Sequence, residues 1–282
     1  MDAHASYAVF SSRTDDPPAD LLLRADVPAL DPSVWSLAVT DIDQAHPLRA
    51  ILSQLAAQRQ PAIRRRDYPA VPTYRRALLL ELGREDSLYP DAMAFAVGAV
   101  LALTEWAAGP VADLTAERVW TAREWRKHVG EKGFEPARHV SIHADWAEDG
   151  RSATLHTHGL VKFAHSDLAA IDVPDEGVRA VSQLLTHLAA VRALTLESLE
   201  PGNAFDPGFG QPMVAFVDAP QDADVVSHLG APPSVVVDVD LDTGEAVEGL
   251  YALLREVKAL DREAPAGRRR WPLPAREPAA AD

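Results

Sequence analysis

The sequence predicts an α+β protein: a mixed or antiparallel sheet with a central β-hairpin at about residues 138–163, flanked by amphipathic helices. The hairpin is indicated by Arg138 to His165, where polar and apolar residues alternate on both sides of Asp149-Gly150, a dipeptide typical of two-residue turns. A helix is indicated by Asp175 to Leu194, where apolar residues recur at intervals of three and four. Elsewhere strands and helices do not alternate regularly, as they would in a doubly wound parallel sheet.

Five of the ten histidines lie in the hairpin segment, and most are predicted to share one face. A two-residue turn fixes the pairs that lie opposite each other: Asp145 and Thr154, His143 and His156, Ser141 and His158. Because side chains alternate along a strand, the polar face is His139, Ser141, His143, Asp145, Thr154, His156 and His158. The other face is expected to pack on a core and consists of Val140, Ile142, Ala144, Trp146, Ala153, Leu155 and Thr157.

The remaining elements follow from periodicity and from turn residues. Strands are predicted at residues 7–10, 35–40, 74–82, 213–218 and 234–241, and an extended pattern at residues 111–120. Helices are predicted at residues 47–58, 91–108, 121–128, 175–194 and 248–260. Residues 1–261 are predicted to form one α+β domain or two packed halves, about 1–130 and 131–261. Residues 262–282, rich in Pro, Ala and Arg, are predicted to be a mobile tail.

Composition narrows the classes of partner and of chemistry. The chain of 282 residues carries a formal net charge of -15, which disfavours nucleic acid and anionic membranes as partners. It has no cysteine, so a thiolate nucleophile is excluded and any metal must be bound by His, Asp or Glu. The N-terminal residues lack the pattern of a secretory signal, so a bacterial cytoplasmic location is expected. The oligomeric state stays open.

The histidine-rich face is the candidate site. His143 and His156 are expected to lie about 5 Å apart at Cβ, with His158 diagonal to them. Neutral imidazoles on rigid strands bind metals well, and Asp145 or His139 would complete the ligand set. The predicted ligands of a divalent metal such as zinc are therefore His143, His156, His158 and Asp145. In the alternative, these residues form the polar side of an antiparallel sheet, or hydrogen-bond beneath a covering helix, and no cofactor is bound.

Other enzyme classes find less support. His139-Val140-Ser141-Ile142 matches half of the motif of two-histidine phosphoesterases, but the partner half is missing. The chain has no Gly-x-Ser-x-Gly nucleophile elbow, and the glycine-rich residues 202–210 precede a predicted strand where a phosphate-binding loop needs a helix.

A segment that begins in the second strand of the hairpin resembles a bacterial family of uncharacterised proteins. Members carry a Thr-x-Gly-Leu strand, then Phe-Gly, then Glu-Leu-Glu and a helix. The matching residues are Thr157-His158-Gly159-Leu160, Lys162-Phe163-Ala164 and Asp167-Leu168, and the likeness covers roughly Arg75 to Phe205. This chain departs from the pattern at Ala164, Asp167 and Ala169. The family has no known activity, so the resemblance implies a bacterial, soluble α+β protein, and the tolerance of other residues at the position of His158 argues against its being a ligand.

Two functions are therefore weighed. The strong acidity and the lack of a complete catalytic motif favour a noncatalytic protein-binding module, of an immunity-like or adaptor kind, that meets a basic protein partner. The alternative is a metal-dependent hydrolase that uses the histidine cluster. An enzyme requires the histidines to converge, whereas a binding module predicts a broad acidic or aromatic patch.

Overall fold

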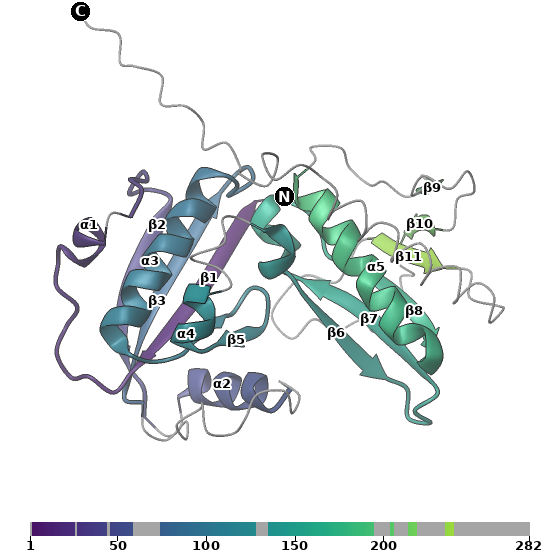
Figure 1. Cartoon of the computed structure of the whole chain (residues 1–282), viewed down its shortest axis with the longest axis horizontal. Coiled ribbons are helices and arrows are strands. Elements are labelled where there is room, and N and C mark those ends of the chain that lie inside the picture. The colour runs from purple at the N-terminus through teal and green to yellow at the C-terminus, as the bar shows by residue number, and fades with distance from the viewer. Residues whose placement is uncertain are drawn as a thin grey trace, which may run out of the picture.

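The computed structural model describes most of the chain up to Leu194 and three short strands beyond it (Figure 1). The described residues are 2–25, 27–43, 46–58, 74–127, 135–194, 204–205, 214–218 and 235–239. The helix predicted at 248–260 and the tail predicted at 262–282 lie outside the described residues. Among the described helices, none combines the length and apolar character needed to cross a membrane.

The α+β class is confirmed, because the described residues form two sheets with helices packed on them. The first sheet has the order β2-β3-β1-β4-β5 and is antiparallel throughout. Its strands are β1 Ala3–Ser11, β2 Trp35–Asp41, β3 Arg76–Arg84, β4 Val111–Asp113 and β5 Arg118–Trp120. The second sheet has the order β6-β7-β8-β11-β10-β9, in which only the β8–β11 pair is parallel. Its strands are β6 Ser141–Trp146, β7 Ser152–His158, β8 Leu168–Pro174, β9 Ala204–Phe205, β10 Val214–Asp218 and β11 Val235–Val239.

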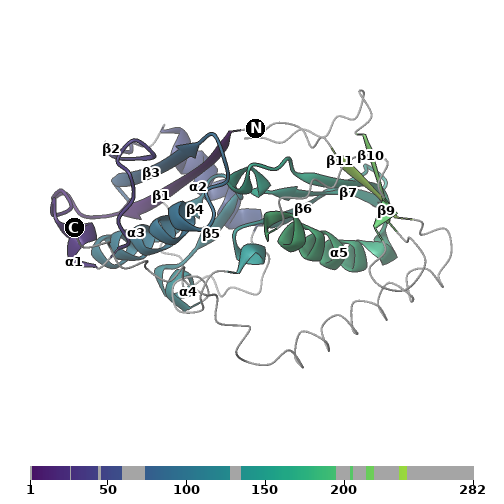
Figure 2. The same cartoon turned by 90° about the horizontal axis from the view of Figure 1, so that it is seen from above.

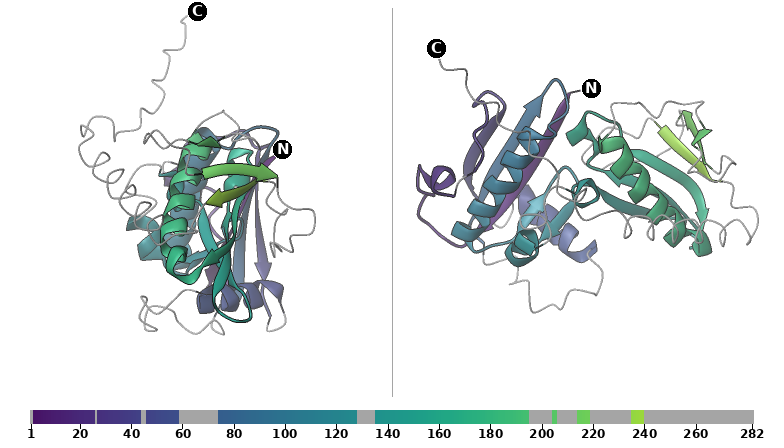
Figure 3. Two further views of the ribbon diagram at one scale, coloured as in Figure 1. Left: turned by 90° about the vertical axis from the view of Figure 1, so that its right-hand side faces the viewer. Right: turned by 45° about the horizontal axis from the view of Figure 1, so that its top comes forward.

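The helices pack on the sheets through their apolar residues. The described helices are α1 Leu21–Arg24, α2 Pro47–Gln58, α3 Asp91–Ala107, α4 Ala122–Trp125 and α5 Asp175–Leu194, with 3-10 turns η4 Pro136–Arg138 and η5 Leu160–Phe163. Helices α3 and α5 lie on the same side of the molecule, each against its own sheet (Figures 2 and 3). Thr121 and Glu124 form a reciprocal capping box that starts α4.

Strand β1 is central in the first sheet and is buried from both sides. Tyr7 and Val9 point into a core shared with α3, whereas Ala8 and Phe10 point into a smaller cluster that contains Leu48 of α2. The near-continuous apolar run of β1 suits a strand covered on both faces. Helix α3 is Ala-rich, so it forms readily and packs closely on the sheet.

The two sheets share one hydrophobic cluster. It joins buried residues of α3 and β1 to Leu155 of β7 and to the inward residues of α5. Between the sheets, Leu160 and Phe163 of η5 are buried in the same cluster, and the backbone N–H of Leu88 donates to the carbonyl oxygen of Lys162 at 2.9 Å. Each fully buried Leu or Phe side chain contributes about 1.5–3 kcal/mol to the free energy of unfolding. The first and second sheets therefore pack through a continuous apolar core.

The predicted elements agree with the structure in most places. The hairpin register is confirmed, and the helices predicted at 47–58 and 175–194 match α2 and α5. The extended pattern at 111–120 is two strands joined by a turn, and strand β8 was not predicted at all. β8 was missed because Leu168-Ala169-Ala170-Ile171 has no alternation, as expected for a strand covered on both faces, and its first three residues are all buried.

The assignment of the apolar face of the hairpin was wrong at its tip. Ala144 and Trp146 were expected to pack on a core, but both are exposed, and Trp146 retains 49% of its surface. The β6 strand is the edge of its sheet, and its last three residues are exposed. On the polar face, His156 and His158 are buried, whereas Asp145 at the tip is exposed, so the face is open to solvent only in part.

Gly159 is expected to be essential for the junction between the hairpin and η5. Its φ of 114° is unfavourable for any other residue, and an added Cβ would lie 2.5 Å from the carbonyl oxygen of His139. We predict that Gly159→Ala lowers the free energy of unfolding by about 2–4 kcal/mol, measured by urea denaturation. Gly150→Ala is the control, because Gly150 also has a positive φ but nothing lies within 4 Å of its added Cβ. Equal losses in the two variants would contradict this steric explanation.

Candidate metal centre

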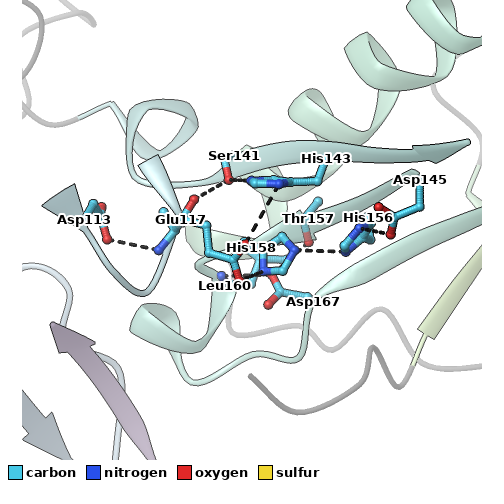
Figure 4. Close-up of polar contacts among 11 residues, drawn as sticks. Asp113, Glu117, Ser141, His143, Asp145, His156, Thr157, His158, Leu160 and Asp167 are labelled. Carbon is cyan, nitrogen blue, oxygen red and sulfur yellow. Dashed lines mark hydrogen bonds and ion pairs between the residues drawn. The ribbon is translucent and has the colours of Figure 1, made fainter. Parts of the chain in front are cut away.

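The hairpin brings three histidines together. His143 of β6 lies opposite His156 of β7 in the register, and His158 follows two residues later on the same face. The ring centroids are 4.6 Å apart for His143 and His158, 4.6 Å for His156 and His158, and 5.9 Å for His143 and His156. Figure 4 shows these rings gathered between the two strands and the turn that leads into β5. The three imidazole rings therefore converge, as a metal site requires.

The β4–β5 turn of the first sheet places Glu117 against these rings. Oε1 of Glu117 lies 3.4 Å from Nδ1 of His158, and Oε2 lies 4.0 Å from Nδ1 of His143. The Glu117 side chain is buried, and its backbone has a φ of 49°. A left-handed conformation costs a non-glycine residue about 1–2 kcal/mol, and such strain concentrates at functional positions.

The turn that carries Glu117 is held at several points. Ser6 of β1 accepts from the N–H of Leu114 through its carbonyl, and its own N–H donates to Oγ1 of Thr115, both at 2.8 Å. Asp113 Oδ1 accepts from the N–H of Ala116 at 3.0 Å. The backbone of the turn is thus fixed by the neighbouring strand and by its own first residue.

A buried ion pair anchors this turn to the second sheet. Nζ of Lys162 donates to Oδ2 of Asp113 and also to the carbonyl oxygen of His139, the latter at 2.9 Å. Both side chains are essentially inaccessible to water. Burial lowers the pKa of Lys162, and the adjacent Asp113 carboxylate opposes that shift. Removing one partner of such a pair costs about 3–5 kcal/mol, because the other charge stays buried alone.

Three residues could hold one metal ion together: Glu117, His143 and His158, each of which offers a ligand atom within 4.8 Å of the others. In a tetrahedral zinc site with bonds of about 2.1 Å, two ligand atoms lie about 3.4 Å apart. The 3.4 Å between Oε1 of Glu117 and Nδ1 of His158 matches that value, whereas the 4.0 Å between Oε2 of Glu117 and Nδ1 of His143 exceeds it.

The predicted ligand set is therefore brought together only in part. His143 and His158 belong to the cluster, whereas Asp145 lies beyond His156, with its Oδ2 2.9 Å from Nε2 of that ring. His156 faces His158 through Nδ1, at 2.9 Å from Nε2 of His158. The buried side chain of His139 lies outside the group, and burial together with Lys162 holds its pKa well below the usual value.

Glu117 was missed because it is distant in sequence and lies on the other sheet. The segment Asp113 to Arg118 was interpreted as part of an extended pattern. A polar run between two short β-strand patterns, Leu114-Thr115-Ala116-Glu117, indicates a turn, but nothing in it indicates which histidines the turn meets. Only the packing of the two sheets decides that contact.

The hydrogen bond that His143 makes on the side away from Glu117 indicates which of its ring nitrogens carries the proton. The hydroxyl of Ser141 donates to the carbonyl oxygen of Ala116, so its remaining role toward His143 is that of an acceptor. Nε2–H of His143 therefore donates to Ser141 Oγ, at 2.9 Å. The lone pair of the neutral ring is then on Nδ1, the atom that faces Glu117.

The same reasoning applies to His158 through His156. Nε2 of His156 lies 2.9 Å from Oδ2 of Asp145, and Nδ1 of His156 lies 2.9 Å from Nε2 of His158. In the tautomer with a proton on Nε2 of each ring, Nε2 of His156 faces the carboxylate with its N–H, and Nδ1 of His156 accepts from Nε2–H of His158. The lone pair of neutral His158 is then also on Nδ1. Two imidazole lone pairs and a buried carboxylate thus converge, an arrangement that a cation stabilises, either a metal ion or a proton on one imidazole.

Asp167 has a structural role. Its Oδ1 accepts from Oγ1 of Thr157 at 2.8 Å and from the N–H of Leu160 at 3.2 Å. Burial raises the pKa of Asp167 to about 6, although these hydrogen bonds oppose the shift. Asp167 therefore fixes the chain where β7 leads into η5, near the candidate site.

An apolar groove lies apart from the histidines. Its volume is about 680 Å³, and it is formed by the segment around α1 together with β2 and α3. Lining residues include Leu22, Val27, Leu30, Trp35 and Phe95. Leu23 at its margin is 82% exposed.

No protein-family model, curated protein or solved structure matches this chain. The likeness to the bacterial family therefore stays a prediction from its motif.

We predict that Asp167 destabilises the folded state as pH rises. Its folded pKa of about 6 exceeds the reference value of 3.8, so its contribution to stability is full below about pH 4 and is lost as pH rises through about 6. Asp167→Asn keeps the accepting oxygen and removes the titration. The free energy of unfolding of the wild type, minus that of the variant, should fall by about 2.4 kcal/mol between pH 4 and pH 7.

Urea denaturation at a series of pH values measures this difference. Asp172→Asn, which removes an exposed carboxylate on the same strand β8, is the control for loss of a charge. A difference between the wild type and Asp167→Asn that does not change from pH 4 to pH 7 would show that Asp167 does not titrate in this range.

Proposed function

We propose that this protein binds a divalent transition metal ion, with zinc as the first candidate, through Glu117, His143 and His158. The observation that supports the proposal is the convergence of their ligand atoms within 4.8 Å, with the outer nitrogen of each ring already engaged in a hydrogen bond. Two imidazoles and one carboxylate suit zinc and the neighbouring transition metals better than calcium or magnesium.

The ion would connect the two sheets. Glu117 belongs to the turn between β4 and β5 of the first sheet, whereas both histidines belong to the hairpin of the second. A ligand that binds only the folded state stabilises it by about 2.7 kcal/mol at a concentration 100 times its Kd. Metal binding is therefore expected to raise the stability of the packed sheets.

Hydrolysis is the reaction class that such a centre would serve. Three protein ligands leave the fourth position of a tetrahedral zinc for water, and zinc lowers the pKa of that water to about 7. The His143 side chain, 17% exposed, is the most accessible of the three ligands. A metal-dependent hydrolase is thus the enzyme hypothesis that follows from the proposed ion.

We keep a noncatalytic protein-binding role as the second candidate. The observation that favours it is the apolar groove beside α1, where Leu23 is exposed. The formal net charge of -15 favours a basic partner.

The metal proposal is tested by elemental analysis of untagged protein and by titration of metal-free protein with zinc, cobalt and manganese. We expect near-stoichiometric binding by the wild type and loss of binding in a Glu117→Gln, His143→Ala double variant. At saturating metal, a chelator should lower the wild-type Tm by roughly 5–10 °C.

Glu148→Gln is the matched control, because it removes an exposed carboxylate from the same hairpin without touching the cluster. It should bind metal as the wild type does. If the wild type binds none of the three metals, the metal proposal is wrong, and the protein-binding alternative is the one to test. If metal is bound, a screen for hydrolysis of simple ester, phosphoester and amide substrates follows.

A further inference from the structure

We infer that Asp145 and His156 act as a positioning pair that holds His158 in its ligand orientation and so sets the metal affinity of the centre. The inference rests on the proposed metal function. It assigns to these two residues a role different from that of ligands, which the sequence had predicted for both. Figure 4 shows the succession Asp145, His156, His158 and Glu117.

The outer end of this succession is a carboxylate at the surface. Oδ2 of Asp145 lies 2.9 Å from Nε2 of His156, and the side chain of Asp145 is 67% exposed while that of His156 is 6% exposed. Asp145 lies on β6 opposite Thr154, and His156 lies on β7 opposite His143. The contact between Asp145 and His156 therefore crosses the hairpin diagonally. A buried imidazole is thereby held by a group that remains solvated.

The inner contact fixes His158. Nδ1 of His156 and Nε2 of His158 are 2.9 Å apart, and the two rings meet edge to face with their centroids 4.6 Å apart. Because both residues lie on one face of β7, the strand itself sets their separation. Rotation of the His158 ring would break this hydrogen bond and turn Nδ1 away from Glu117.

Partners of this kind affect metal affinity in a known way. A ligating imidazole whose other N–H is hydrogen-bonded keeps the correct tautomer and is a more basic ligand. Loss of such a partner typically weakens metal binding by about 10- to 100-fold. Here the partner is an imidazole that is itself polarised by a carboxylate, so loss of either member should have an effect in the same direction.

Ser141 has a comparable contact with His143, but it also binds the carbonyl oxygen of Ala116 in the Glu117 turn. A substitution of Ser141 would therefore disturb a ligand and the turn together. Asp145 and His156 contact the centre through His158, which makes them the better positions for a test.

The experiment compares Zn²⁺ affinity in the full chain by competition with a chromophoric chelator, for the wild type, Asp145→Ala and His156→Phe. We expect Kd to rise by about 10- to 100-fold in each variant while one ion per chain is still bound. The visible spectrum of the Co²⁺-substituted protein should change in both variants, because it reports the geometry and field of the ligands. A residue that served folding alone would leave that spectrum unchanged.

Thr154→Ala is the control, since Thr154 lies opposite Asp145 in the same hairpin and takes no part in the histidine contacts. It should have the wild-type Kd and Co²⁺ spectrum. If His156→Phe fails to fold, Asp145→Ala at its exposed position decides. Wild-type Kd and spectrum in Asp145→Ala would overturn the positioning role while leaving the metal site intact, whereas absence of metal binding by the wild type would overturn both.

Discussion

The buried contact between Lys162 and Asp113 is the interaction on which the arrangement of the candidate centre depends. Lys162 comes from η5, directly after the hairpin, and Asp113 from the strand that begins the turn to Glu117. The same Asp113 carboxylate accepts from the N–H of Ala116. A pair of opposite charges inside the apolar core is stable only when both members are present and well hydrogen-bonded. The junction of the two sheets and the position of Glu117 are therefore determined together.

The strained backbone of Glu117 and the burial of its carboxylate are both typical of a functional site. Glu117 adopts a left-handed backbone conformation, and its carboxylate is buried against two imidazoles whose outer nitrogens are engaged elsewhere. A core that served stability alone would be better with apolar side chains there, because buried polar groups require compensation. The proposed cation would supply this compensation. It would also account for a turn of one sheet that meets the histidines of the other.

Local patterns in the sequence allowed a large part of the hairpin to be predicted. The Asp149-Gly150 turn sets the register, and the register brings His143, His156 and His158 onto one face. The same pattern misled at Trp146, because alternation indicates which residues share a face but not whether another element covers it. Asp145 was taken for a ligand on the same ground, although its carboxylate lies on the far side of His156 from the cluster.

By itself, the sequence determined the α+β class, the ends of α2 and α5, and the histidine face of the hairpin, because these depend on contacts between neighbouring residues in the chain. Only the tertiary structure decided that Glu117 meets His143 and His158, since that contact joins residues of different sheets. It also decided the roles of Asp145 and His156, which depend on the direction in which each side chain points. The physical reason is that periodicity records which face a residue occupies, whereas a binding site depends on which surfaces the core brings together.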